Sequence, residues 1–225
     1  MNRSFVFFLA ALTAAAGGAC SSPERAELDA PPEQELSQLT DQERQEGWTL
    51  LFNGEDLSGW EGDARVWSVR DGAIVGSSEG VELEDNTFLI YEAERFGDFH
   101  LEAEIKLRNH NSGIQFRSEK VSDWVVRGYQ ADAAEGNWWG SLYGEKTGRQ
   151  VIANGWVGKG ETVVRADDWN QYEIICSGPK ITLKLNDLTT VELEDDMAAE
   201  GIIALQVHRG PAMEVQFRNL KLRKL

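Results

Sequence analysis

Apolar residues recur at every second position through most of the chain after Gly47, and this period restricts the fold more than any other feature. In FHLEAEIKL (99–107) the odd-numbered residues are apolar and the even-numbered residues are polar. The two kinds of side chain would therefore face opposite sides of a β-strand. KITLKL (180–185) and MEVQF (213–217) repeat the pattern. No stretch of ten or more residues after Gly47 has a convincing helical period.

Turn signals separate these short segments. VWSVRDGAIVG (66–76) predicts two strands joined at Asp71-Gly72, a typical hairpin turn. About a dozen half-apolar strands indicate two antiparallel sheets packed face to face. We therefore expect one all-β domain over 47–225, a sandwich of the jelly-roll type. Its last strand, within 213–222, should pair near the first strand, WTLLF (48–52).

The N-terminus has the pattern of a bacterial lipoprotein signal. Arg3 supplies the positive charge, an apolar stretch follows, and Cys20 comes directly after small residues. We expect a signal peptide over 1–19, lipidation at Cys20 and an acidic flexible tether over 20–46, with room for a short helix at its end. Ser21 does not resemble the aspartate signal for inner-membrane retention. The expected location is the cell envelope, anchored by lipid to the outer membrane; simple secretion is the alternative.

Charge and cysteine usage exclude some functions. The formal net charge of −16 argues against nucleic acid as a partner, because phosphate backbones are bound by clusters of Lys and Arg. Membrane contact is expected only through the lipid anchor. Apart from Cys20 the sole cysteine is Cys176, in an apolar strand, where a small buried hydrophobe is expected rather than a catalytic thiol. The chain has eight tryptophans, and sugar stacking competes with core packing as their use.

A series of motifs in a fixed order makes the chain resemble the bacterial 3-keto-disaccharide hydrolase family. The motifs are GWTLLFNGEDLSGW, VWSVRDGAIVG, GDFHLEAEIKL, NSGIQFRS, RGYQAD, GSLYGE, GIIALQVHRG and VQFRNLKLRKL. The resemblance covers 47–225 and implies a concanavalin-like jelly-roll fold. It also implies a hydrolase or lyase acting on glycosides that carry a ketone at C3. A sugar 3-dehydrogenase acting upstream would be the partner, and no organic cofactor is implied.

The chemistry of such substrates defines the groups that a site needs. A C3 ketone acidifies the hydrogen on C2, and the resulting enolate can expel the oxygen on C1. The site needs a base near C2, a donor or cation for the enolate oxygen, and an acid for the leaving group. It does not need the paired carboxylates of ordinary glycosidases.

Four residues are the catalytic candidates. In RGYQAD (127–132) Gln130 and Asp132 would share one face of a strand, which we expect to be the ligand-facing one. Asp132 is the leading candidate for the base or for a metal ligand, against a solvated or turn-capping role. Arg117 would bind a sugar oxyanion or form a surface ion pair. His208 ends an apolar strand and would be a base, a metal ligand or a structural residue.

The remaining candidates would bind substrate. Adjacent tryptophans in EGNWWGSLYG cannot both point inward from a strand, so stacking on a sugar is a natural use for at least one of them. Any metal would be a divalent cation such as Ca²⁺, held by Asp132 and Gln130. The substrate-binding candidates are Trp138, Trp139, Tyr143, Tyr129, Arg127, Asn111 and Glu145, although Asn111 also fits an ordinary turn.

Two functions remain open from the sequence. An enzyme predicts acid, base and cation side chains that converge in one pocket. A non-catalytic, lectin-like carbohydrate-binding domain predicts an open aromatic platform with few perturbed titratable groups. The family resemblance favours the enzyme.

Overall fold

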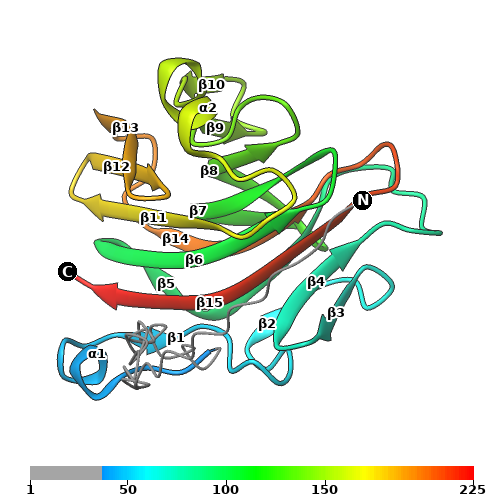
Figure 1. Cartoon of the computed structure of the whole chain (residues 1–225), viewed down its shortest axis with the longest axis horizontal. Helices are drawn as coiled ribbons and strands as arrows, with labels where there is room; N and C mark the ends of the chain where they lie inside the picture. The colour runs from blue at the N-terminus through cyan, green and yellow to red at the C-terminus, as the bar shows by residue number, and fades with distance from the viewer. Residues whose placement is uncertain (1–36) are drawn as a thin grey trace, which may run out of the picture. The chain divides into compact units, whose positions relative to one another are not determined.

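The computed structural model describes residues 37–225, and these form a sandwich of two antiparallel sheets (Figure 1). The eight-stranded sheet has the order β13-β12-β11-β6-β15-β4-β3, with β1 also paired to β15. Its strands are β1 (Thr49–Leu50), β3 (Trp67–Arg70), β4 (Ala73–Ser77), β6 (Phe99–Leu107), β11 (Asn170–Ser177), β12 (Lys180–Leu185), β13 (Leu188–Glu194) and β15 (Glu214–Lys224).

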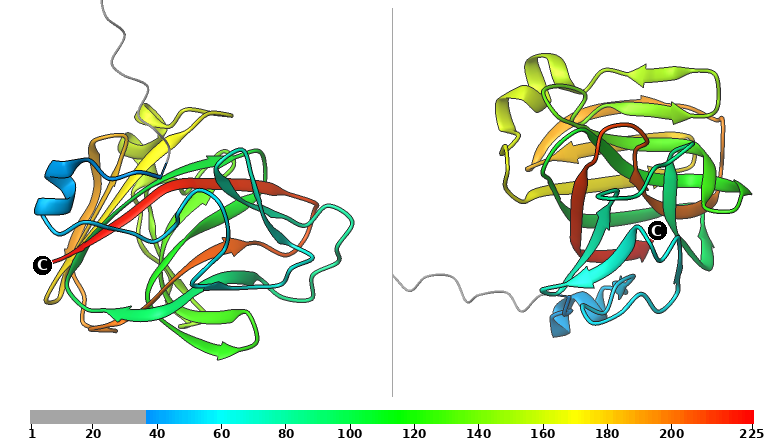
Figure 2. Two further views of the ribbon diagram at one scale, coloured as in Figure 1. Left: turned by 90° about the horizontal axis from the view of Figure 1, so that it is seen from below. Right: turned by 90° about the vertical axis from the view of Figure 1, so that its right-hand side faces the viewer.

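The seven-stranded sheet has the order β10-β9-β8-β7-β14-β5-β2. Its strands are β2 (Trp60–Glu61), β5 (Thr87–Phe96), β7 (Asn111–Ser122), β8 (Val125–Ala134), β9 (Leu142–Glu145), β10 (Gln150–Ala153) and β14 (Gly201–Val207). The two further views in Figure 2 show the strands curving strongly along their length. The predicted all-β jelly-roll sandwich is confirmed.

The core lies between the sheets and takes its residues from the apolar positions of the alternating strands. Leu101 and Ile105 of β6 belong to one buried cluster with Ile114 and Phe116 of β7. Cys176 lies in the same cluster, fully buried, and burial raises the pKa of its thiol to about 12. The cysteine is therefore a core residue, as predicted.

Two expected pairings are present. β3 and β4 form the hairpin around Asp71-Gly72. The first and last strands of the domain are neighbours, because Thr49 pairs with Leu222. The β3–β4 hairpin is expected from its turn residues. The β1–β15 pair joins segments that are more than 170 residues apart in the chain.

Helices are short: α1 (Asp41–Gln45), an irregular π-type turn η1 (Trp156–Gly160) and α2 (Glu161–Val163). Within residues 37–225 no helix is long and apolar enough to span a membrane. The predicted signal peptide, Cys20 and most of the predicted tether lie outside the described residues.

The last ten residues of the predicted tether are packed on the domain, and they contain the short helix expected at its end. Thr40 and Glu43 form a capping box that starts α1. Ser37 is buried and its backbone N–H donates to Asn219. Glu43 pairs with Lys221 of β15 at 2.5 Å, and this bond lowers the pKa of Glu43 to about 2. A polar surface segment thus becomes ordered through charge-assisted contacts that its composition does not reveal.

Candidate functional site

A cavity of about 640 Å³, here called the first cavity, opens on the face of the seven-stranded sheet that is turned away from the core. Strands β7, β8, β9, β10 and β14, the residues that follow them and the segment before β5 supply its walls. Seven of the predicted site residues line it: Asn111, Gln130, Asp132, Trp138, Tyr143, Glu145 and His208.

The alternation of β8 places its polar residues in the first cavity. Tyr129 and Ala131 are fully buried in the core cluster, whereas Gln130 and Asp132 line the cavity. The expected separation of the two faces is therefore present from Tyr129 onward. Opposite Asp132 on β7 lies Gly113, where an added Cβ would come within 2.7 Å of the Gln130 side chain. Glycine at this position makes room for Gln130.

A chain of amide contacts orients the Asp132 carboxylate. The Gln115 amide donates to the oxygen of Gln130 at 2.7 Å, and the Gln130 amide nitrogen donates to Asp132 Oδ1 at 2.5 Å. The other carboxylate oxygen of Asp132 has no hydrogen bond within residues 37–225. Gln130 therefore presents a donor to Asp132 and positions the carboxylate towards the cavity.

Burial changes the proton affinity of both acids in the first cavity. Asp132 is 4% exposed, and this desolvation raises its pKa to about 7, against the lowering effect of the Gln130 bond and with a further rise from the negative charge of Glu145. Burial also raises the pKa of Glu145, against the hydrogen bond from Asn86. Two carboxyl groups with raised pKa values thus lie in one cavity, an arrangement that is common at sites of acid–base chemistry.

His208 ends β14 at the edge of the first cavity, half-buried. Its Nδ1 lies 2.6 Å from the carbonyl oxygen of Arg209, which can only accept, so Nδ1 carries the proton and Nε2 keeps its lone pair. Burial lowers the pKa of His208, and His110 packs edge-on against it at 4.8 Å between ring centroids. His208 is thus a neutral imidazole that can accept a proton or a hydrogen bond.

Two buried amide atoms in the first cavity have no partner in the described part of the chain. They are Oδ1 of Asn111 and Nε2 of Gln206, although the Gln206 amide is near enough to Glu145 to have a lowering effect on the pKa of that carboxyl. Buried polar atoms of this kind are normally satisfied by protein, water or ligand. Gln206 was not predicted, although one signal was available: it is a lone polar residue in the apolar strand GIIALQV.

The two adjacent tryptophans lie in different environments. Trp138 is half-buried and lines the first cavity, beside Tyr143. Trp139 is 6% exposed and stacks on Tyr172 in the core, so its predicted role in substrate binding is corrected. Tyr172 in turn donates its hydroxyl to the backbone carbonyl of Asp132. Trp139 therefore packs on Tyr172, which in turn holds the backbone at Asp132.

Two further predicted residues have structural roles. The Arg117 side chain is 1% exposed, and its guanidinium donates to the carbonyls of Gly97 and Gly178 and to Asp98. These bonds occupy most of the N–H donors of the guanidinium. Arg117 therefore holds neighbouring turns together and is not free to bind a sugar oxyanion. Tyr129 is fully buried and donates its hydroxyl to Asp195, so it does not line the first cavity.

Arg127 lies in a second cavity of about 500 Å³ on the same sheet. The register of β7 and β8 shifts between Phe116 and Glu119, and the alternation of β8 does not extend to Arg127. It pairs with Glu119. Its predicted role in substrate binding would therefore apply to this second cavity.

The cations of the first cavity were also not predicted. Lys146 follows β9 and pairs with Asp85 at 2.6 Å. Arg209 follows His208 and donates through Nη1 to the carbonyl of Glu84. Both residues line the first cavity. Asp85 and Glu84 belong to the segment before β5, so only the tertiary fold brings these cations to Asp132.

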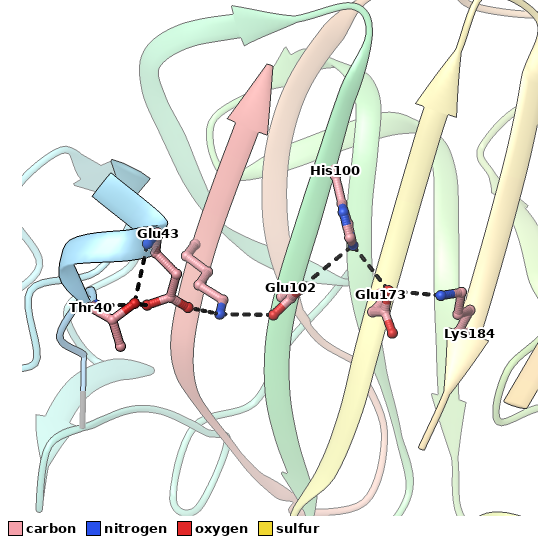
Figure 3. Close-up of polar contacts among 7 residues, drawn as sticks. Thr40, Glu43, His100, Glu102, Glu173 and Lys184 are labelled. Carbon is pink, nitrogen blue, oxygen red and sulfur yellow. Dashed lines mark hydrogen bonds and ion pairs between the residues drawn. The ribbon is translucent and has the colours of Figure 1, made fainter. Parts of the chain in front are cut away.

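One group of three potential metal ligands exists within residues 37–225: His100, Glu102 and Glu173, whose ligand atoms lie within 4.8 Å of one another. They lie on β6 and β11 of the eight-stranded sheet, in a chain of polar contacts that begins at Thr40 and Glu43 (Figure 3). Lys221 binds Glu102 and Lys184 binds Glu173, at 2.9 Å and 3.1 Å. Because both carboxylates already have a cationic partner, this group does not fit a metal centre. His100 lies between Glu102 and Glu173 in this chain of contacts.

The donor set of the first cavity does not form a ready metal site either. Gln130 turns its amide nitrogen towards Asp132, whereas a hard cation needs oxygen ligands. Among the described residues, His100, Glu102 and Glu173 are the only group of three potential metal ligands, and none of them lines this cavity. Binding of a divalent cation stays a prediction. The chemistry proposed below uses only the side chains of the protein.

Comparison with known proteins identifies relatives at the level of a domain family and of fold. The family model of the 3-keto-alpha-glucoside-1,2-lyase-like domain matches residues 47–223. No curated protein matches the sequence.

Among solved structures, a candidate glycosyl hydrolase from Parabacteroides distasonis ATCC 8503 shares 20% identity with a TM-score of 0.65, over 85% of this chain and 100% of its own. The carbohydrate-binding module CBM66 from Bacillus subtilis shares 19% identity with a TM-score of 0.56, over 79% and 96%. A Bacillus subtilis protein of unknown function with a galectin-like fold shares 12% identity with a TM-score of 0.54, over 79% and 94%. These likenesses show the shared sandwich fold.

Proposed function

The chain belongs to the family of 3-keto-alpha-glucoside-1,2-lyase-like domains, and on this premise we propose that it is a carbohydrate-active enzyme that cleaves 3-keto-glycosides by elimination. The observation that carries the proposal is that buried Asp132, the imidazole of His208 and the amide of Gln206 line one cavity. A lectin-like platform does not require two carboxyl groups with raised pKa values, and Asp132 and Glu145 supply both.

Asp132 is the proposed general base. Its carboxylate takes the proton from C2 of the sugar, and the electron pair of the C–H bond forms the enolate with the C3 ketone. A base of this kind works best when its pKa lies near the pH of the reaction, and a pKa of about 7 meets that condition. Gln130 holds Oδ1, so the free oxygen of Asp132 faces the substrate.

The developing negative charge needs a donor and the leaving group needs a proton. The unpartnered Nε2 of Gln206 is suited to donate to the enolate oxygen, with the charge of Lys146 on the same wall. The enolate then forms the C1–C2 double bond and the C1–O bond breaks. Glu145, with a raised pKa, is suited to protonate the departing oxygen. Later addition of water across the double bond would give net hydrolysis.

Binding residues complete the proposal. Trp138 offers an aromatic face to the sugar ring and Tyr143 borders it. The free Oδ1 of Asn111 accepts from a sugar hydroxyl. His208, with its free Nε2, accepts from a second hydroxyl or assists the base. The ketone itself must come from an oxidoreductase acting on C3, because nothing in the elimination creates it.

The decisive experiment incubates the purified protein with a 3-keto-glucoside and follows release of the aglycone. We expect turnover by the wild-type protein and a loss of about 10²- to 10⁴-fold in the Asp132→Asn variant. Parallel reactions after dialysis against a chelator, with and without added Ca²⁺ or Mn²⁺, test the predicted cation. Failure to turn over any of several keto-glycosides, with saturable binding retained, would replace the enzyme by the lectin-like alternative.

A further inference from the structure

The second cavity continues the first along β8. Gly128 lines the second cavity and Asp132 lines the first. These positions are four residues apart on one strand, or about 13 Å, which exceeds the length of a single pyranose ring. Lys146 lines both cavities, so they are neighbours on this sheet. A glycoside of two units bound across β8 and β9 would place one unit in each cavity.

The lining of the second cavity is richer in basic side chains than the protein as a whole. Five basic side chains line it against two acidic ones, Glu119 and Glu200, although the chain carries a net charge of −16. The basic residues are Arg95, Arg117, Arg127, Lys146 and Arg149. Three of the five pair with carboxylates outside the lining: Arg117 with Asp98, Lys146 with Asp85 and Arg149 with Asp195. A strongly acidic protein repels acidic ligands in general, so a basic cavity is the place where it could accept one.

Two of these arginines are available to a ligand, because Arg149 binds Asp195 through both of its terminal nitrogens. The side chains of Arg95 and Arg127 are 53% and 51% exposed. Each keeps part of its guanidinium free of hydrogen bonds within residues 37–225: Arg95 uses only Nε on Glu200, and Arg127 leaves Nη1 free beside its bonds to Glu119. Exposed ion pairs of this kind contribute little stability, so a carboxylate or sulfate can share or replace the acidic partner.

The remaining lining residues suit a sugar ring. Met197 and Ala198 offer a small apolar surface, and Thr147 adds a hydroxyl. Arg117 is not available, because its guanidinium is bound to backbone carbonyls and to Asp98. The free guanidinium groups therefore lie around a surface that a ring can cover.

We propose that the second cavity binds an acidic sugar unit, bearing a carboxylate or a sulfate ester, that is the leaving part of the substrate whose 3-keto unit reacts in the first cavity. The role as leaving group rests on the proposed function, whereas binding of the acidic sugar can be measured without it. Arg95 and Arg127 bind the anionic group, and Lys146 lies at the junction of the two units.

Binding is tested by titrating the purified protein with methyl glucuronide, with methyl glucoside 6-sulfate and with neutral methyl glucoside, following NMR shifts in the β9–β10 turn. We expect at least one acidic sugar to bind about tenfold more tightly than the neutral one at low salt, with the preference reduced at high salt. The two acidic probes distinguish a uronate from a sulfate. Equal affinity for all three sugars would overturn the proposal.

Variants assign the effect to the second cavity. Arg95→Gln with Arg127→Gln should abolish the preference for the acidic sugar, whereas Glu119→Gln should strengthen it by about two- to fivefold, because Arg127 loses its competing carboxylate. Arg70→Gln is the matched control, since Arg70 is an equally exposed, ion-paired arginine on the other sheet. An unchanged preference in the double variant would also overturn the proposal.

A turnover comparison separates this proposal from the proposed function. Disaccharides with a 3-keto-glucosyl unit and either a glucuronate or a glucose leaving unit are compared in kcat/KM. Faster turnover of the acidic one, reversed by the double variant, supports both proposals. No turnover of either, with selective binding of methyl glucuronide intact, would defeat the elimination chemistry and leave the acidic-sugar site standing.

Discussion

Asp132 illustrates how one side chain acquires its chemistry from its surroundings. As a free residue it is a carboxylate at neutral pH. On β8 it is buried among amides, with no cationic partner at hydrogen-bond distance within residues 37–225, and its pKa rises to about 7. The hydrogen bond from Gln130 orients the Asp132 carboxylate and partly offsets the rise in its pKa caused by burial. The residue type is common, whereas the environment is specific.

The activity should therefore depend on the protonation of Asp132. We expect a bell-shaped dependence of kcat/KM on pH, because Asp132 must be ionised to accept the proton from C2 and Glu145 must be protonated to serve the leaving group. The measurement is a pH–rate profile between about pH 5 and 9 for the wild-type protein. A rate that is flat across this range would remove Asp132 from the role of base.

Trp138 and Trp139 should respond differently to truncation. Trp138→Ala is expected to raise KM by about tenfold with little change in thermal stability, since the ring lies on the cavity wall. Trp139→Ala should lower the free energy of unfolding by about 3–5 kcal/mol, because it leaves a void beside Tyr172. Steady-state kinetics and denaturant unfolding of both variants check this. Similar losses of stability in the two variants would contradict the assignment.

At the scale of elements, the β7–β8 pair carries the site. Their register sets Gln115 opposite Gln130 and Gly113 opposite Asp132, so the polar residues of two strands share one face. A slip by one residue would turn all of them into the core. The long-range neighbour β14 then adds Gln206, from a segment 74 residues beyond Asp132 in the chain.

Gly113→Ala tests whether this packing positions the base. The added Cβ would lie 2.7 Å from both the Ala131 carbonyl oxygen and the Gln130 Cγ, too close without a shift of β8 or of the Gln130 side chain. We expect a loss of about 1–3 kcal/mol in stability and about 10²-fold in kcat. Gly97→Ala is the control, because its Cβ would meet the nearest atom at an ordinary 3.5 Å. Full activity in Gly113→Ala would show that Gln130 does not need its present position.

For the whole molecule, Asp132 opposes stability at the pH where the enzyme would work. The folded protein holds the Asp132 proton up to about pH 7, whereas the unfolded chain releases it near pH 4. Stability from this residue is therefore fully present below about pH 4 and is lost as the pH rises to about 7. Keeping an ionised base buried therefore lowers the free energy of unfolding at the pH of the reaction.

Asp132→Asn should accordingly stabilise the protein in a pH-dependent way. Relative to the wild-type protein, we expect little change near pH 4.5 and a gain of roughly 2–4 kcal/mol at pH 8, since the amide has no charge to desolvate. Denaturant unfolding of both proteins at several pH values gives the difference. Comparing the two proteins cancels the opposite effect of His100 and His208, whose lowered pKa values favour folding as the pH rises. An equal gain at both pH values would exclude linkage to Asp132.

Local patterns in the sequence determined the sandwich, the β3–β4 hairpin and the polar face of β8. Each depends on strand alternation or on turn residues a few positions apart, which act in the same way wherever the chain folds. The same alternation brought Gln130 and Asp132 together and identified one exposed tryptophan, without showing which of the two it is.

Only the tertiary structure decided the rest of the site. Arg117 became a buried anchor because carbonyls of Gly97 and Gly178, distant in sequence, surround it. Lys146, Gln206 and Arg209 became cavity residues because β9 and β14 lie on either side of the β7–β8 pair. The pKa and reactivity of a side chain depend on its burial and on the charges near it. Both come from many residues that only the folded chain brings into contact.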